Sequence, residues 1–143
     1  MKDEALALAE TSPDPGRKLN LLREYVQAFV LRSLSESEAF SQLSFVGNTA
    51  LRFLFGLPRF SEELDFSLER DNSYEPIKWL DKLKRDLALS GFTAELRWDD
   101  RRVVHSAWIR LSGLLQEAKL TAMPNQNLST KLEIDSRPPR PEP

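Results

Sequence analysis

The chain has 143 residues, with 20 lysines and arginines against 22 aspartates and glutamates, no cysteine, and a formal net charge of −2 at pH 7. The length suits one domain with a sizeable core, the charge excludes nucleic-acid binding through an overall positive field, and the lack of cysteine excludes disulfides and thiolate metal sites. The acidic N-terminal residues do not resemble a signal peptide and no apolar run has bilayer length, so we expect a soluble cytoplasmic protein without a membrane partner.

The N-terminal third is expected to be helical. Residues 1–10 are compatible with a helix, which the following Pro- and Gly-rich segment would end. Over 17–33 apolar residues recur at three- and four-residue steps, which predicts an amphipathic packing helix. A further helical turn or two is expected over 35–42, where Ser35 and Glu38 have the spacing of a capping box.

The next stretch is predicted to be a strand, a tight glycine turn and a short helix. The strand 43–46 ends at Gly47, Asn48 and Thr49 are helix-capping residue types, and an apolar helix follows over 50–55. The first N–H groups of a helix have no partner within the helix and can bind phosphate. This turn is therefore a candidate phosphate site, although a plain turn and helix cap explains the same residues.

A second strand is predicted over 63–68, where Glu63 and Asp65 alternate with apolar residues. Because successive side chains of a strand point to opposite faces, both carboxylates belong to one face. They offer a cation site beside the glycine turn, while the alternative is an ordinary solvated strand face.

The C-terminal half is predicted to alternate between helices and strands. A helical period covers 74–90, a hairpin of two strands that would extend the sheet antiparallel covers 92–111, and a short helix lies within 113–120. The last strand, 128–135, would close a single domain over residues 1–136. A Pro-rich tail over 137–143 is expected to be extended and disordered.

The last strand places its apolar residues inward and Lys131, Glu133 and Asp135 outward. If it lies beside the 63–68 strand, Glu133 joins Glu63 and Asp65 on one face. Three carboxylates so close repel each other unless a cation lies among them, and Mg²⁺ prefers such oxygen ligands. On this hypothesis Lys131 binds a phosphate.

Other chemically active residues have more ordinary interpretations. The single histidine, His105, lies in a predicted strand and is not needed for this chemistry. Trp79, Trp98 and Trp108 are interpreted as core or sheet-face residues, with base stacking by an exposed Trp98 as the alternative. Exposed basic residues are interpreted as solvated, with contact to an RNA backbone as the alternative; they are Lys82, Lys84, Arg85, Arg101 and Arg102.

Two runs resemble a known family. Residues 45–52 (FVGNTALR) and 56–66 (GLPRFSEELDF) are similar to the signature of the AbiEii/AbiGii nucleotidyltransferase-like toxins, in the DNA polymerase β-type nucleotidyltransferase superfamily. Residues 131–135 (KLEID), followed by Arg-Pro-Pro, match the later Lys-x-acid strand and Pro-Pro turn. The resemblance implies an α/β (α+β) fold with a mixed sheet of about five strands flanked by helices.

The resemblance also implies roles for individual residues. Glu63 and Asp65 stand at the family's Asp-x-Asp metal motif, and Lys131 and Glu133 at its Lys-x-acid motif, so these four are the candidate catalytic residues, with the three acids as Mg²⁺ ligands. Family members use a nucleoside triphosphate (NTP), some modify the acceptor end of tRNA, and a cognate antitoxin restrains them. The candidate nucleotide-binding residues are Gly47, Asn48, Thr49, Arg52, Arg59 and Ser61.

Three departures from the family pattern leave alternatives open. Asn48 replaces a small residue where the backbone approaches phosphate, and Glu63 replaces an aspartate, which moves the carboxylate outward by one methylene. Family members also usually continue into a C-terminal helical region. The alternatives to an active Mg²⁺-dependent toxin are therefore an impaired nucleotide- or partner-binding remnant, one half of a split enzyme, and a fragment.

Overall fold

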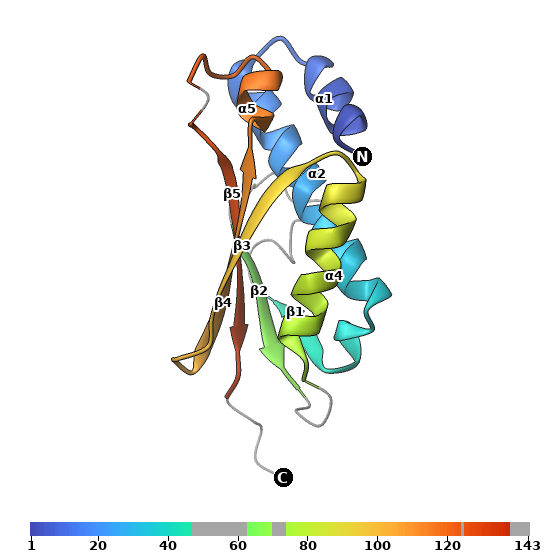
Figure 1. Cartoon of the computed structure of the whole chain (residues 1–143), viewed down its shortest axis with the longest axis vertical. Coiled ribbons are helices and arrows are strands. Elements are labelled where there is room, and N and C mark those ends of the chain that lie inside the picture. Colours follow the sequence, from blue (N-terminus) through green and yellow to red (C-terminus); the bar gives the residue numbers. More distant parts are fainter. Residues whose placement is uncertain (47–62, 70–73, 124, 138–143) are drawn as a thin grey trace.

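The computed structural model describes residues 1–46, 63–69, 74–123 and 125–137, and the structural statements below concern these residues. A mixed sheet of five strands carries its helices on one face, which confirms the predicted mixed α/β class (Figure 1). The elements in chain order are α1 (Lys2–Glu10), α2 (Pro15–Glu36), the 3₁₀ turn η1 (Ala39–Ser41), β1 (Leu43–Val46), β2 (Glu63–Leu68), α4 (Pro76–Leu89), β3 (Thr93–Asp99), β4 (Val104–Ser112), α5 (Leu114–Glu117) and β5 (Leu128–Asp135).

The strand order is β1-β2-β5-β4-β3, so the last strand of the chain lies in the middle of the sheet. β5 runs parallel to β2 and antiparallel to β4, and the other neighbouring pairs, β1 with β2 and β3 with β4, are antiparallel. The predicted β3–β4 hairpin is therefore present. It joins the sheet through β5 and not directly through β2.

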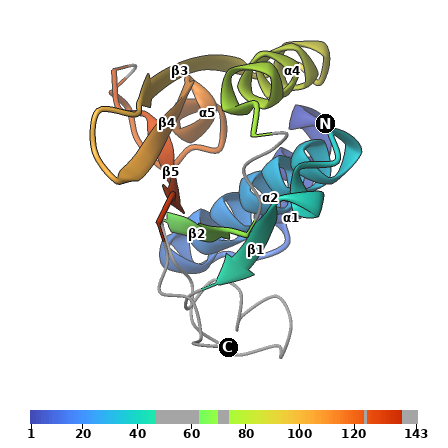
Figure 2. The same ribbon diagram turned by 90° about the horizontal axis from the view of Figure 1, so that it is seen from below.

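The sheet curves around α2 and α4 (Figure 2). Its concave face is apolar because every second residue of each strand points toward these helices. Burial of these side chains from water is the main favourable contribution to folding. The inward aliphatic and phenylalanine residues of the central strands are all buried: Leu64, Phe66, Leu68, Ala107, Ile109, Leu111, Leu128, Leu132 and Ile134.

The helix α2 begins earlier than the apolar period predicts. Asp14 is its N-cap and accepts a hydrogen bond from the Arg17 N–H at 3.1 Å, and Pro15 occupies the first turn, where its missing N–H costs nothing. The predicted capping box is wrong, because Ser35 lies inside α2. Glu38 has a left-handed φ of 61° and caps η1 without a side-chain hydrogen bond.

An aromatic cluster connects α4 to the hairpin. A hydrogen bond of 2.6 Å joins Tyr74 Oη and His105 Nδ1, and the two rings stack with their centroids 5.7 Å apart. The His105 ring also meets Trp98 edge to face, and Tyr74 meets Trp79 in the same way. Burial, and to a lesser extent Asp100, raises the pKa of Tyr74, which keeps its hydroxyl protonated. His105 is thus a packing residue, as its place in the sequence predicts.

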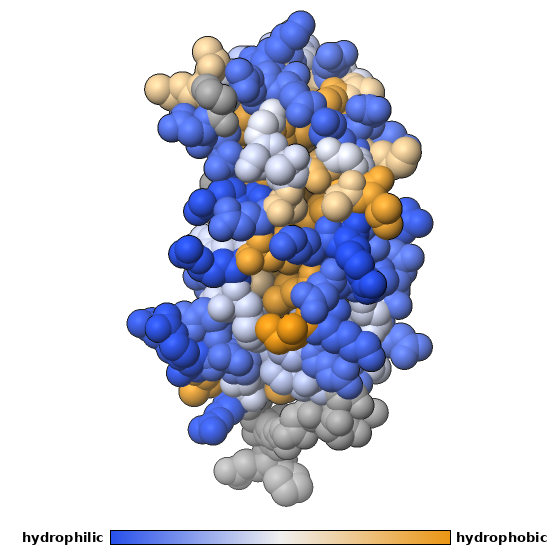
Figure 3. All heavy atoms as spheres, viewed as in Figure 1, coloured by the Kyte–Doolittle hydropathy of each residue, from blue (hydrophilic) through white to orange (hydrophobic). Residues whose placement is uncertain are grey.

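The surface is mostly polar around a band of apolar residues that follows α4 and β3 (Figure 3). Two large apolar residues of α4 are exposed: Ile77, at 54% exposure, and Leu89, at 86%. In the described part of the chain, no helix has the length and apolarity needed to cross a membrane.

The first two residues after β5 form hydrogen bonds to the β3–β4 hairpin and to the end of β5. The Ser136 N–H donates to the Val103 carbonyl at 3.1 Å, and the Arg137 N–H donates to Asp135 Oδ1 at 3.0 Å. The rest of the predicted Pro-rich tail lies outside the described residues.

Candidate functional site

The face of the sheet opposite the helices carries the candidate site. Residues that pair across neighbouring strands point to the same face, so outward side chains form rows across the sheet. One row crosses all five strands and another crosses four. They consist of Val46, Asp65, Glu133, Ser106 and Asp99, and of Glu63, Lys131, Trp108 and Arg97.

The two rows bring three carboxylates together. Glu63 and Asp65 are two residues apart on β2, and Glu133 pairs with Asp65 across the parallel β2–β5 ladder. One carboxylate oxygen from each lies within 4.8 Å of those of the other two, and all three residues are half-buried. We call this group the acidic triad. The condition set by the sequence, that the last strand lie beside β2 with Glu133 on the same face, is met.

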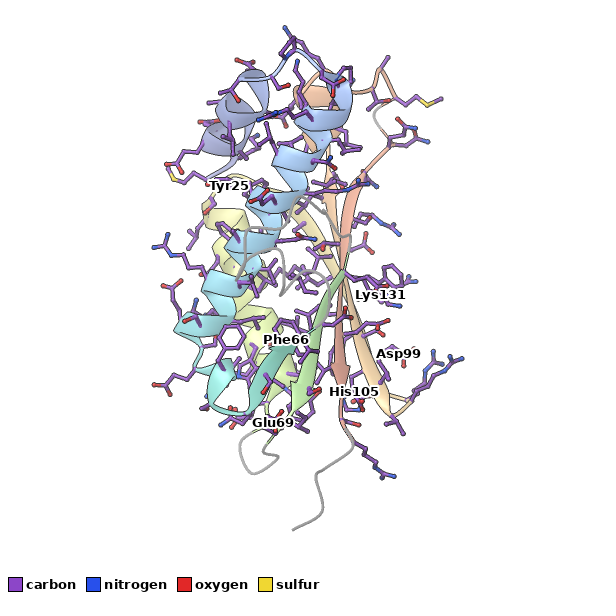
Figure 4. The ribbon with its side chains drawn as sticks, turned by 180° about the vertical axis from the view of Figure 1, so that it is seen from behind. Tyr25, Phe66, Glu69, Asp99, His105 and Lys131 are labelled. Atoms are coloured by element: carbon purple, nitrogen blue, oxygen red, sulfur yellow. The ribbon has the colours of Figure 1, made fainter. Side chains whose placement is uncertain are left out.

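Lys131 lies beside the acidic triad. Its Nζ is 2.6 Å from Glu133 Oε1 and 4.6 Å from the centre of the Trp108 ring. The hydrogen bond to Glu133, with the charges of Glu133, Glu63 and Asp65, raises the pKa of Lys131 and keeps it protonated. In Figure 4, Lys131 and Asp99 lie on the side of the sheet away from the helices, whereas Phe66 points toward them.

The surroundings of Asp65 disfavour its charged form, whereas those of Lys131 favour the charged form. Burial first, and then the negative charge of Glu133, raises the pKa of Asp65, while Lys131 partly opposes this. Ionised Asp65 is therefore costly unless a further positive charge lies close to it.

The acidic triad fits a hard divalent cation. Its donors are carboxylate oxygens, which Mg²⁺ prefers, and one oxygen from each of the three residues lies within 4.8 Å of the other two. An octahedral Mg²⁺ holds adjacent ligand oxygens about 3 Å apart and opposite ones about 4 Å apart, so the three carboxylates would move closer together around a bound ion. Three carboxylates beside one ammonium also leave two negative charges uncompensated, which matches a divalent ion.

The predicted nucleotide-binding residues cannot be placed in the same way. Gly47, Asn48, Thr49, Arg52, Arg59 and Ser61 lie outside the described residues. β1 ends at Val46, which pairs with Asp65, so the predicted phosphate turn follows in sequence directly on a position beside the acidic triad.

Trp108 is a site residue that the sequence did not single out. It is 46% exposed, and with residues of β3, β4 and β5 it lines a surface hollow of about 290 Å³. We call this site the Trp108 hollow; it is formed by Glu95, Arg97, Trp108, Arg110 and Ser129. A usable signal was present, since Trp108 lies between the inward residues Ala107 and Ile109 and must point outward.

The other tryptophans and Lys82 have structural roles. Trp79 is buried and Trp98 packs against the core, so Trp98 is not an exposed stacking residue. Lys82 Nζ lies 2.6 Å from Asp86 Oδ2 as an i,i+4 ion pair on α4, which agrees with its interpretation as a helix-surface charge.

Comparisons with known proteins agree with this architecture. The model of a family described as nucleotidyl transferase AbiEii toxin, type IV toxin–antitoxin system, matches residues 29–143. The chain is similar to a crystal structure of a candidate nucleotidyltransferase from H. pylori, with 23% identity and a TM-score of 0.58 over 82% of this chain and 45% of that one. It is equally similar to JHP933 from Helicobacter pylori, with 23% identity and a TM-score of 0.58 over 85% of this chain and 46% of that one.

The two structural matches establish the fold, and in both the chain spans less than half of the matched protein. No curated protein matches the chain.

Proposed function

Because the chain belongs to the AbiEii family of nucleotidyl transferase toxins, we propose that it transfers a nucleotide from an NTP to an RNA acceptor, with tRNA as the acceptor class. Its place would be the cytoplasm, where both substrates are found, and its partner would be the antitoxin of a toxin–antitoxin pair. The reaction would depend on Mg²⁺.

One observation carries the proposal: the acidic triad lies beside a protonated lysine on an open sheet face. Glu63, Asp65 and Glu133 would hold Mg²⁺, which would neutralise negative charge developing on the transferred phosphoryl group. Lys131 Nζ is already held at the edge of the acidic triad and could exchange Glu133 for a phosphate oxygen of the NTP. Each of these side chains would thus bind or orient the nucleotide without a large backbone movement.

The remaining predicted residues, which follow β1 in the sequence, would bind the triphosphate. Backbone N–H groups of Gly47, Asn48 and Thr49 would donate hydrogen bonds to the phosphate oxygens, as N–H groups at a helix start do, and Arg52, Arg59 and Ser61 would add side-chain donors. Phosphoryl transfer depends mainly on positioning and on charge stabilisation, which is what such residues supply.

The test is transfer of label from each of the four NTPs to total tRNA in the presence of Mg²⁺. We expect labelled RNA with the native chain and at least about a hundredfold slower transfer with Asp65→Asn, since this change removes an oxygen ligand and a charge. Asp99→Asn is the matched control, because Asp99 lies in the same row of the same face but outside the acidic triad. No transfer by the native chain, beside an active relative, would contradict the proposal.

A second candidate is a nucleotide-binding remnant without activity. It is favoured by the 2.6 Å contact between Lys131 and Glu133, because the chain then supplies a cation of its own to one carboxylate of the acidic triad. Calorimetry separates the two candidates. NTP binding that strengthens with Mg²⁺ supports the enzyme, and NTP binding that is indifferent to Mg²⁺ supports the remnant.

A further inference from the structure

The Trp108 hollow lies next to the acidic triad but has the opposite charge. Its lining includes two arginines and one glutamate, and the ammonium group of Lys131 lies over the ring of Trp108. Because Glu133 already neutralises Lys131, the hollow is basic through its own lining, which carries a net charge of +1 on a chain whose net charge is −2. Such a local patch is the kind of surface that a protein without an overall positive field needs in order to bind a polyanion.

Trp108 offers a flat apolar surface to the solvent. Its neighbours in sequence, Ala107 and Ile109, are fully buried, while Trp108 points to the face that carries no helix and is 46% exposed. Lys131 Nζ lies 4.6 Å from the ring centre, a cation–π contact that restrains the ring. The ring contacts Lys131 and also lines the hollow. Its orientation is thus restrained, and it can stack against a planar group bound in the hollow.

The two arginines are placed to bind phosphates beside that ring. Arg97 pairs with Trp108 across the β3–β4 ladder, and Arg110 lies two residues after Trp108 on β4, so all three share one face. Both arginine residues are exposed. Within the described residues, neither Arg97 nor Arg110 forms an ion pair, and the one carboxylate that lines the hollow is that of Glu95, the cross-strand partner of Arg110.

The hollow lies on the β4 side of the acidic triad. Lys131 contacts both Glu133 and Trp108, so the two sites are direct neighbours. β1, which leads in sequence to the predicted phosphate turn, lies on the other side of β2. A second substrate reaching the acidic triad from the β4 side would approach it on the side away from β1.

We propose that the Trp108 hollow binds the single-stranded 3′ end of the RNA acceptor, with a base stacked on Trp108 and backbone phosphates on Arg97 and Arg110. This inference rests on the proposed function, whose acceptor site it supplies. At about 290 Å³ the hollow is at the lower limit of ligand pockets, which suits one base and not a whole NTP. An aromatic surface with basic groups along it is the usual arrangement for single-stranded RNA.

The first experiment measures binding of a fluorescently labelled, single-stranded RNA octamer to the full chain by anisotropy, without NTP. We expect Trp108→Leu to weaken binding about tenfold and Trp108→Phe to retain most of it, because phenylalanine still stacks. Arg102→Gln is the matched control for charge, since Arg102 is exposed in the hairpin turn and does not line the hollow.

Salt dependence separates phosphate contacts from stacking. Loss of one phosphate contact lowers the slope of log affinity against log salt by about 0.7 for a single strand. We expect that decrease for Arg97→Gln and for Arg110→Gln, and an unchanged slope for Trp108→Leu. Equal affinity of native chain and Trp108→Leu, or no binding of the octamer by the native chain, would overturn the inference.

Two further measurements distinguish this inference from the proposed function. Asp65→Asn should slow transfer at least about a hundredfold and leave octamer binding unchanged. A native chain that binds the octamer through Trp108 without transferring a nucleotide would refute only the proposed function. If Trp108→Leu instead weakens binding of NTP, or of a partner protein, and leaves the RNA affinity unchanged, the hollow is not an acceptor site and the inference fails.

Discussion

The two faces of the sheet are built by the same strands but contribute differently to folding. On β2 and β5 the inward residues Leu64, Phe66, Leu132 and Ile134 are at most 2% exposed, and their burial stabilises the fold. The residues that alternate with them are charged and lie on the open face: Glu63, Asp65, Lys131 and Glu133. One position along a strand therefore separates a buried apolar side chain, which stabilises the fold, from a carboxylate. The carboxylates repel one another and are suited to bind a cation.

The largest expected effect concerns the inward face. Phe66→Ala removes a ring that is 1% exposed and should lower the free energy of unfolding by about 3–5 kcal/mol, through lost burial and the cavity left behind. Ser67→Ala, one residue further along β2 and on the open face, should change it by no more than about 0.5 kcal/mol. Urea unfolding of both variants measures the difference. Similar losses for both would mean that the two faces are not divided in this way.

The next effect concerns cation binding on the open face. A ligand that binds only the folded state stabilises it by about 2.7 kcal/mol at one hundred times its dissociation constant. Mg²⁺ at that excess should therefore raise the unfolding temperature of the native chain, and the shift should largely disappear in Glu133→Gln. Thermal unfolding with and without EDTA tests this. An equal Mg²⁺ shift in both proteins would place the cation elsewhere.

A smaller effect is expected for the ion pair between Lys131 and Glu133. Both side chains are largely shielded from solvent, at 22% and 27% exposure, so their coupling should exceed that of an exposed pair and reach about 1 kcal/mol. A double-mutant cycle with Lys131→Met and Glu133→Gln, in EDTA, measures it. Because the pKa of Lys131 is raised in the folded state, this stabilisation is complete below the unfolded-state pKa and is lost as pH rises through the folded-state pKa. Coupling that is unchanged at high pH would contradict this origin.

The alternation of apolar and charged residues was sufficient to predict which face each side chain occupies. The bounds of β1, β2 and β5 agree with the prediction to the residue, and Glu63, Asp65, Lys131 and Glu133 all lie on the open face as expected. Alternation is a local property of the chain, set by backbone geometry alone. It requires no knowledge of the neighbouring strand.

Strand order could not be derived in the same way. Nothing in the period of 128–135 indicates that β5 inserts between β2 and β4 and runs parallel to β2, and the acidic triad exists only because of that pairing. Trp108 illustrates the same limit, because its outward position follows from alternation but its exposure depends on the lack of a helix over that face. The helix ends also differ from the prediction where capping decides them, as Asp14 does for α2.

The smallest effect tests the open face most directly. Burial and Glu133 raise the pKa of Asp65 in the folded state, so the folded protein binds that proton more tightly than the unfolded chain does. Stability is then highest below the unfolded-state pKa and falls as pH rises to the folded-state pKa, above which the full penalty remains. Asp65→Asn removes this charge and, in EDTA at neutral pH, should stabilise the protein by about 0.5 kcal/mol, a value kept small because the group is partly solvated. Urea unfolding across the acidic range should find the gain absent at low pH. A variant less stable than the native chain at neutral pH would mean that Asp65 is held by favourable contacts and not by repulsion, and the open face would then need no cation to offset it.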